Sequence, residues 1–401
     1  MKNSYKPVIF ILILLNLTAC HSSQHDPGVI GFNFAELQKI KESIVKGDIE
    51  AKKTYDKLLQ EASHYLSLEP EKVTDGDLPP SGNHHDFYAI GRYSWPNPGT
   101  QDGMPWIRID CNINPDANGL RFDLARYNNT VNRIKTLCMA WFYSTDEKYA
   151  TKAAELLRVW FINEDTKMNP HFEFASALPG VHDGMPIGII FGTTLIEMVD
   201  HVKLLTLSEN WREEDDKALK RWFSAYVKWL LTSDFGKKEK AAKNNHGTWY
   251  AAQIATFSLY TGETEHTKNM IELAKQQIEE QVALDGSLPH ELKRDWAFSY
   301  TVYNMRAFTT LALCADHIND DLWNYKTSDG KSLRIAYEFL VPYLLNEKDW
   351  QWGIVREDEQ TALHALPMMR RAAGKYHAAG LKQAAEYLQS VYPADLKRNW
   401  L

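Results

Sequence analysis

Apolar residues recur at spacings of three and four along most of this 401-residue chain, and this pattern predicts a succession of amphipathic helices. No segment has the alternation of apolar and polar residues that is typical of a half-buried strand. The predicted helices come in pairs, and such hairpins bury their apolar faces only by stacking on neighbours. The fold class is therefore all-α, either an open solenoid or a closed ring. The predicted helices span residues 34–45 with 51–66, 128–143 with 148–161, 187–205 with 213–232, 248–260 with 264–282, and then 300–317, 331–345, 361–379 and 381–391.

The region of residues 70–120 interrupts this helical pattern. It is dense in Pro, Gly, Asn and Asp, above all over residues 93–98 and 102–106. Because these residues favour turns, the region is predicted to be one long ordered loop. A loop of this length inside a compact domain is uncommon and usually has a function.

The first twenty residues have the layout of an export signal. Lys2 and Lys6 precede an apolar run over residues 8–15, and small residues then lead to Cys20. The run is too short for a membrane span, and a cysteine at the cleavage point resembles the bacterial lipoprotein signal. We therefore expect Cys20 to carry lipid after the signal is removed.

This signal sets the expected domain organisation. Residues 1–19 form the signal peptide, residues 20–30 a tether, and residues 31–401 a single domain. The protein is then an exported lipoprotein whose lipid anchor on Cys20 holds it to a membrane, in the periplasm or on the cell surface of a Gram-negative bacterium.

Charge and cysteine content exclude several classes of protein. The net charge of −7 becomes −9 when Lys2 and Lys6 are removed, so nucleic acid is not an expected partner and any anionic partner needs a local basic cluster. Cys111, Cys138 and Cys314 are widely spaced and form neither a disulfide framework nor a CxxC metal motif. We expect the last two to be small core residues. The 13 Trp and 19 Tyr exceed what a core needs and suit stacking on sugar rings.

Two polar clusters could carry chemistry. The first, Asn244-Asn245-His246, opens an apolar helix, where side-chain donors and the helix dipole can face an anion. The second contains Arg294, whose guanidinium fits a carboxylate, and Tyr300 at the start of a later helix. Taken singly, the first could be a helix cap with a buried histidine, and the second a packing pair.

Together the clusters match the needs of β-elimination on a polyuronate. The C5 proton becomes removable when the adjacent carboxylate is neutralised, and amide, imidazole and guanidinium groups can do this. A base must then take the proton, and an acid must protonate the departing O4. A tyrosine serves as the base only where a nearby cation favours the phenolate, and Arg294 is the candidate cation.

The run from Asn244 to Tyr250, followed by Glu291 to Arg294 and by Tyr300, resembles the signature of the alginate lyase superfamily. Residues 93–108 and 169–190 also resemble Bacteroides-type members. The six-residue step from Arg294 to Tyr300 brings the chain nearer to polysaccharide lyase family thirty-eight than to the related family five. The resemblance implies an incomplete (α/α) toroid of helical hairpins, favouring the ring over the solenoid. It also implies a lyase without cofactor that cleaves a 1,4-linked polyuronate, either alginate (polymannuronate) or glucuronan, and it assigns no residue to a metal.

The resemblance also assigns roles to residues. Asn245, His246 and Arg294 would neutralise the uronate carboxylate, and Tyr300 would be the acid. Tyr300 would also be the base when the C5 hydrogen and O4 share a face, whereas His246 would be the base for the opposite epimer. Further candidates for binding neighbouring sugars are Asn244, Trp249, Trp95 and Arg108.

Two other functions stay open. A helical-toroid glycoside hydrolase acting on uronate oligosaccharides needs well-placed carboxylates, for which Asp183, Glu291 and Asp295 are available. A non-catalytic glycan-binding lipoprotein would explain the aromatic residues but leaves both polar clusters without a role. The runs His84-His85-Asp86 and His290-Glu291 have no recognised metal spacing, and we expect surface histidines there.

Overall fold

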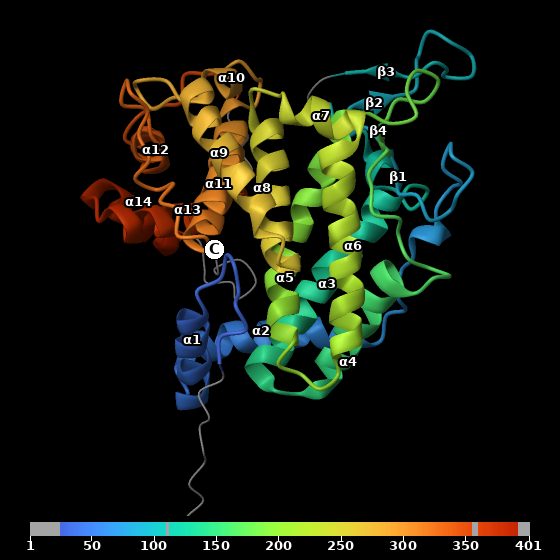
Figure 1. Cartoon of the computed structure of the whole chain (residues 1–401), viewed down its shortest axis with the longest axis horizontal. Coiled ribbons are helices and arrows are strands. Elements are labelled where there is room, and N and C mark those ends of the chain that lie inside the picture. The colour runs from blue at the N-terminus through green and yellow to red at the C-terminus, as the bar shows by residue number, and fades with distance from the viewer. Residues whose placement is uncertain (1–24, 110–111, 355–359, 392–401) are drawn as a thin grey trace, which may run out of the picture.

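The computed structural model describes residues 25–109, 112–354 and 360–391 (Figure 1). The predicted signal peptide, Cys20 and Cys111 lie outside these ranges, so export and lipid attachment stay predictions. Within the described ranges, no helix is long and apolar enough to cross a membrane.

An inner layer of helices runs through the molecule, and each member contacts the next (Figure 1). Helix α8 lies near the middle of this layer and is buried on almost all sides, which explains why its sequence is apolar all round. The inner helices are α3 (Asp123–Ser144), α5 (Thr194–Leu205), α8 (Asn245–Thr261), α11 (Ala297–Asp316) and α13 (Gln360–Tyr376).

An outer layer of helices covers this inner one. Helices α4, α9 and α14 pair with the inner helices α3, α8 and α13 as hairpins, while α6 packs on α8 and α12 on α13 and α14. The predicted stack of helical hairpins is thereby confirmed as an incomplete (α/α) toroid. The outer helices are α4 (Glu147–Leu157), α6 (Glu213–Thr232), α9 (Thr264–Gln281), α12 (Leu333–Leu344) and α14 (Ala379–Val391), and the chain begins with α1 (Phe34–Lys46) and α2 (Ile49–Leu66), of which α2 packs on α3.

Several helical segments differ from the prediction. The segment predicted as one helix from residue 187 begins as a 3-10 helix, Pro186–Thr193, before α5 starts. Close packing explains this, because a Cβ at Gly188 or Gly192 would clash with Ala175 or Gln253. The short helices α7 (Asp234–Lys240) and α10 (Pro289–Leu292) were not predicted, since four to seven residues are too few to show a helical period.

The region of residues 70–120 contains short strands that the sequence did not predict. β1 (Tyr88–Ile90) pairs in parallel with β4 (Phe174–Ala177), and β2 (Ser94–Trp95) pairs antiparallel with β3 (Ile107–Arg108). Strands of two to four residues are too short to show alternation. The pairing with β4 ties the region to the segment that leads into α5, so the loop is held against the toroid.

The buried core accounts for much of the aromatic content. Phe161, Trp222 and Phe223 contact one another edge to face or stacked, and Tyr226 and Phe257 extend the cluster. Cys138 and Cys314 are buried free thiols, as predicted.

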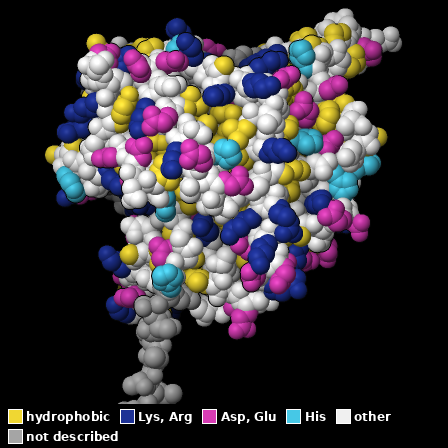
Figure 2. Space-filling view, in the orientation of Figure 1, with side chains coloured by type: hydrophobic (Ala, Val, Ile, Leu, Met, Phe, Trp, Pro, Cys, Tyr) yellow, Lys and Arg dark blue, Asp and Glu magenta, His cyan; other side chains and the backbone are white. Residues whose placement is uncertain are grey.

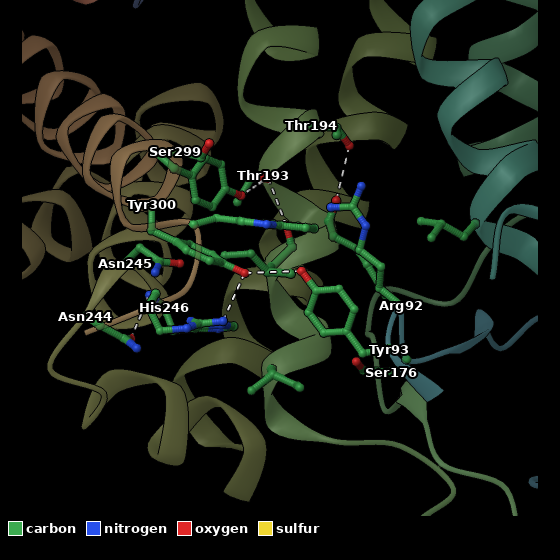
Figure 3. A pocket seen from close by; sticks show the side chains of 18 of the residues that line it. Arg92, Tyr93, Ser176, Thr193, Thr194, Asn244, Asn245, His246, Ser299 and Tyr300 are labelled. Atoms are coloured by element: carbon green, nitrogen blue, oxygen red, sulfur yellow. Dashed lines mark hydrogen bonds between the residues drawn. The ribbon is translucent and has the colours of Figure 1, made fainter. Parts of the chain in front are cut away.

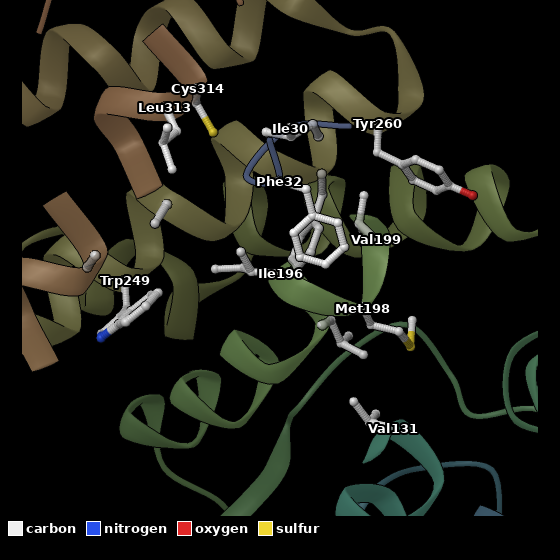
Figure 4. Packing of buried hydrophobic residues seen from close by; sticks show 14 of the residues in the cluster. Ile30, Phe32, Val131, Ile196, Met198, Val199, Trp249, Tyr260, Leu313 and Cys314 are labelled. Carbon is white, nitrogen blue, oxygen red and sulfur yellow. The ribbon is translucent and has the colours of Figure 1, made fainter. Parts of the chain in front are cut away.

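The N-terminal segment is fastened to α5. The carboxylate of Asp200 accepts hydrogen bonds from the backbone N–H groups of residues 30–32, at 2.6, 2.6 and 3.0 Å. Ile30 and Phe32 pack beside Ile196 and Val199 (Figure 4). Since Val29 and Ile30 are buried, the prediction of a tether through residue 30 was wrong at its end, and the fold begins earlier.

Candidate active site

A cavity of about 670 Å³ opens where α8 and α11 begin (Figure 3). Its walls come from the loop around β2 and β3, from the 3-10 helix before α5, from the first turns of α8 and α11, and from Thr361 and His364 of α13. Both helix N-termini carry backbone N–H groups and the positive end of the dipole, which favour an anion.

Arginine dominates the charge of this cavity. Arg92 and Arg108 come from the loop, and Arg294 and Arg306 from the region of α11, whereas none of the described lining residues is acidic. On the outer face shown in Figure 2, acidic and basic side chains are interspersed. The positive lining is therefore the local basic cluster that a chain of net charge −7 needs to hold an anion.

Arg294 and Tyr300 meet directly in the cavity. Arg294 Nη2 donates a hydrogen bond to Tyr300 Oη at 3.0 Å, and the guanidinium carbon lies 4.0 Å from the centre of the tyrosine ring. Tyr93 Oη lies 3.4 Å from Tyr300 Oη (Figure 3). The phenol oxygen of Tyr300 therefore faces both a guanidinium and a second phenol.

His246 is oriented by a buried acid. Its Nδ1 lies 2.8 Å from Oε2 of Glu239, which is 4% exposed near the end of α7. A carboxylate at this position accepts a proton-bearing Nδ1, and Nε2 is then the nitrogen available to a bound molecule. The short helix α7 thus places an acid behind the imidazole.

Asn244 and Asn245 lie at the beginning of α8. Asn244 Oδ1 accepts from the backbone N–H of His246 at 3.1 Å and caps the helix. Asn245 is held by Glu291, which accepts from its backbone N–H at 2.6 Å and from its Nδ2 at 3.0 and 3.1 Å. Burial raises the pKa of the Glu291 carboxyl, although these hydrogen bonds and the nearby Arg294 act in the opposite direction.

The candidates for binding neighbouring sugars lie in different places in the structure. Arg108 lines the cavity with its guanidinium 5.8 Å from the centre of the Tyr93 ring. Trp95 is not a lining residue, and its Nε1 donates to Asn112 O at 2.9 Å. The prediction for Trp249 was wrong: its side chain is 4% exposed and packs in the core, 5.0 Å from Tyr303 between ring centres. The helical period turns residue 249 inward, behind Tyr303.

Several site residues were missed from the sequence. Tyr93 and Arg92 belong to the turn-rich loop, in which no local pattern distinguishes a wall residue from its neighbours. Arg306 follows Tyr303 by three positions and shares its helical face, so this spacing was a usable signal. Glu239 is the buried acid in a run of exposed lysines, and nothing in the sequence marks it as facing inward.

The residues proposed for other functions lie elsewhere. Asp183 and Asp295 are exposed, Glu291 is fully buried, and the cavity lining includes none of the three. His85 Nδ1 lies 2.7 Å from Lys167 O, and Asp86 accepts from Asn169 at 2.6 Å. Across the described part of the chain, no three His, Cys, Asp or Glu side chains are grouped as metal ligands.

The chain is similar to known lyases over most of its length. Residues 73–350 match the family model described as "Alginate lyase". An alginate lyase from Bacteroides ovatus is 30% identical, with a TM-score of 0.85 over 93% of this chain and 97% of that one.

More distant structures share the fold. Alginate lyase A1-III from Sphingomonas species A1 is 14% identical, with a TM-score of 0.58 over 94% of this chain and 97% of that one. A variant of the same enzyme complexed with a tetrasaccharide has a TM-score of 0.57 at 14% identity, over 94% of this chain and 96% of that one. A search of curated proteins finds no match. The family match covers more than half of the sequence, and the chain therefore belongs to the alginate lyase family of polysaccharide lyases.

Proposed function

We propose that this enzyme cleaves a 1,4-linked polyuronate, alginate or glucuronan, by β-elimination in the arginine-lined cavity. The observation that carries the proposal is the contact between Arg294 and Tyr300 within a cavity that Asn245 and His246 also line. A cation, a phenol, an imidazole and an amide then surround one sugar residue.

The first task of the site is to neutralise the uronate carboxylate. Arg294 offers a permanent positive charge, and the N-terminus of α8 adds the helix dipole. As the C5 proton leaves, negative charge spreads onto the carboxylate oxygens. Groups fixed in place before the reaction stabilise that charge without reorganising.

The second task is to move the protons. The base takes the C5 proton, the C4–C5 double bond forms, the C4–O4 bond breaks, and O4 takes up a proton, so atoms and electrons balance. Tyr300 can take both roles when the C5 hydrogen and O4 lie on one face of the sugar, because Arg294 supports the phenolate. For the opposite epimer, Nε2 of His246 is the base, and the contact of Nδ1 with Glu239 fixes the orientation of the ring.

The hydrolase alternative is disfavoured by the same cavity. Hydrolysis of a glycoside uses a pair of carboxyl groups beside the scissile bond. Among the described lining residues there is no carboxyl group, and Glu291 is sealed behind Asn245. The membership of the lyase family agrees with elimination.

A panel of polyuronates tests the proposal. Purified enzyme without added cofactor is expected to release an unsaturated product that absorbs ultraviolet light from polymannuronate, polyguluronate or glucuronan. New reducing ends without the double bond would show hydrolysis and overturn the proposal.

The variant Tyr300→Phe tests the role of the phenol. It is expected to bind polymer with affinity close to that of the wild type, while kcat falls about 1,000-fold because acid–base catalysis contributes on the order of 10²–10⁴. The variant Tyr343→Phe, on α12 and outside the cavity lining, is a matched control that should keep full activity. Near-normal turnover by Tyr300→Phe would remove Tyr300 from the mechanism.

A further inference from the structure

Glu291 has an unequal set of hydrogen-bond partners. Its Oε1 accepts from the backbone N–H of Asn245 at 2.6 Å, from Asn245 Nδ2 at 3.1 Å and from Asn304 Nδ2 at 3.0 Å. Its Oε2 accepts only from Asn245 Nδ2, at 3.0 Å, among the described residues. Oε1 is therefore saturated with donors, whereas Oε2 is the oxygen with room for a proton.

This arrangement conflicts with the task of Asn245 as long as Glu291 is ionised. An ionised Glu291 draws the Nδ2 group of Asn245 toward itself, and no described residue donates to Asn245 Oδ1. The acceptor Oδ1 then remains for the cavity that Asn245 lines (Figure 3). An amide oxygen repels a substrate carboxylate, and a second negative charge directly behind it adds to the repulsion.

A protonated Glu291 removes the conflict. Oε2–H can donate to Asn245 Oδ1 once the amide has exchanged the positions of its oxygen and nitrogen by rotation about Cβ–Cγ. The backbone contact of Asn245 with Oε1 is untouched by this rotation, and Nδ2 now directs its N–H bonds at the cavity. The amide becomes a donor to the carboxylate, as the elimination requires.

We propose that Glu291 is a positioning residue that works as the neutral acid, and that its proton sets the Asn245 amide so that its NH₂ group faces the substrate carboxylate. This inference rests on the proposed function. The proton comes from solvent before substrate binds and stays on Glu291 through the cycle, so the balance of the elimination is unchanged.

The groups around Glu291 are consistent with a retained proton. Glu291 is fully buried, and burial raises its pKa. Two charged or titratable groups face it, Arg294 beyond α10 and His246 of α8, and both favour the ionised form of Glu291. Glu239 of α7 lies on the other side of the His246 ring. Helices α9 and α11 contribute only the neutral amides of Gln281 and Asn304. Ionisation of Glu291 is therefore expected to produce a fall in activity as pH rises.

The variant Glu291→Gln tests the inference. Glutamine keeps an oxygen for the backbone of Asn245 and for Asn304, and its Nε2 donates to Asn245 Oδ1 as the neutral acid does. We expect kcat/KM within about threefold of the wild type at pH 6 and a loss of the alkaline fall in kcat/KM. The control is Glu280→Gln, which removes an exposed carboxylate of α9 paired with Lys243 and should keep the wild-type pH profile.

Two outcomes would overturn the inference. A loss of activity of about 100-fold in folded Glu291→Gln would show that the ionised form is needed, and an unchanged alkaline fall would show that the protonation of Glu291 is irrelevant. Calorimetry can measure the affinity of the Tyr300→Phe enzyme for a saturated hexauronate across pH. This affinity should show the same fall at alkaline pH, and the fall should be lost when Glu291→Gln is added. This readout separates failure of the inference from failure of the proposed function, which the polyuronate panel decides.

A second variant keeps the inference testable if Glu291→Gln does not fold. Asn304→Ala removes a donor to Oε1 that favours the ionised form of Glu291. The alkaline fall should then move to higher pH. A fall that stays in place, or that moves to lower pH, would contradict the inference.

Discussion

Asp200 and Glu291 both have buried carboxyl groups that accept hydrogen bonds from backbone N–H groups, but they lie in different surroundings. The partners of Asp200 are the backbone N–H groups of residues 30–32, about 170 positions earlier in the chain, and none of these residues lines the cavity. The partners of Glu291 include the side chain of Asn245, which lines the cavity. Burial raises the pKa of both carboxyls.

The difference shows that a buried carboxyl group has different roles in different surroundings. Where every donor is a backbone group closed off by packing, the carboxylate fixes the chain and stabilises the fold. Where one partner is the amide of a residue that lines a cavity, the carboxyl group and its proton also decide which atom of that amide faces a ligand. Substitutions in the two regions should therefore separate stability from activity.

The largest expected effect on stability comes from Asp200→Ala. It leaves three N–H groups without their acceptor, and each buried orphan costs about 1–3 kcal/mol, so the free energy of unfolding should fall by at least about 3 kcal/mol. Urea unfolding measures this, and kcat/KM below the transition should stay within about twofold. Asp26→Ala removes an exposed acceptor for Gly28 N and is the matched control, expected within about 0.5 kcal/mol. If Asp200→Ala lost activity but kept its full stability, Asp200 would act on the active site as Glu291 does, and the proposed difference between the two regions would be wrong.

Glu197 joins the two regions and should have an intermediate, pH-dependent effect. It lies three positions before Asp200 on α5 and pairs with Lys135 at 2.5 Å and with Arg306 at 3.3 Å, and Arg306 lines the cavity. Burial alone would raise its pKa, but these two cations outweigh it and lower the pKa to about 2. This contribution to stability is present above the ordinary glutamate value of 4.5 and is lost as pH falls through about 2.

The variant Glu197→Gln tests the predicted direction of this pH dependence of stability. The variant should be about 3 kcal/mol less stable than the wild type at pH 7, because a shift of one pKa unit is worth about 1.4 kcal/mol. The difference should shrink below pH 4. Urea unfolding at pH 7, 5 and 3 measures it, and a difference that is constant with pH would show that the two cations do not set the charge of Glu197.

The smallest expected effect comes from Trp249→Phe, four positions after Asn245 on α8. Trp249 packs against Tyr303, and its Nε1 has no described hydrogen-bond partner, so the variant should lose about 1 kcal/mol of stability. KM should stay within about twofold, whereas Arg108→Ala, on the cavity wall, should raise it. A raised KM in Trp249→Phe would extend the substrate site into the region that the structure assigns to the core.

The helical part of the fold could be predicted because its signal is local. The predicted helix 213–232 coincides with α6, and the predicted helix 264–282 exceeds α9 by one residue. Apolar spacing and the glycine at position 262 are local signals for such boundaries, and in the structure Gly262 has the positive φ that ends α8. The parallel pairing of β1 with β4 joins segments about 85 positions apart, and no spacing within either segment encodes it.

The candidate site likewise contains residues that could be predicted from the sequence and residues that could not. Asn245, His246, Arg294 and Tyr300 stand out because they belong to polar clusters just before or at the start of apolar helices, and the structure places all four around one cavity. The residues behind and across from them were missed because their roles come from tertiary contacts. Glu239 is an ordinary acid until α7 turns it toward His246, and Tyr93 is one loop residue among many until the loop folds over Tyr300.

The attachment of residues 30–32 to Asp200 has a mechanical consequence. A force that pulls on the chain before residue 28 is passed to α5 through three hydrogen bonds to Asp200, and to α11 and α13 through the contacts of His317 with Ile30 O and of Arg371 with Gly31 O. Thr194, at the first turn of the same helix, lines the cavity about 9 Å further along the axis. Tension at the N-terminal end is thereby shared among three inner helices and does not fall on the cavity end of α5 alone.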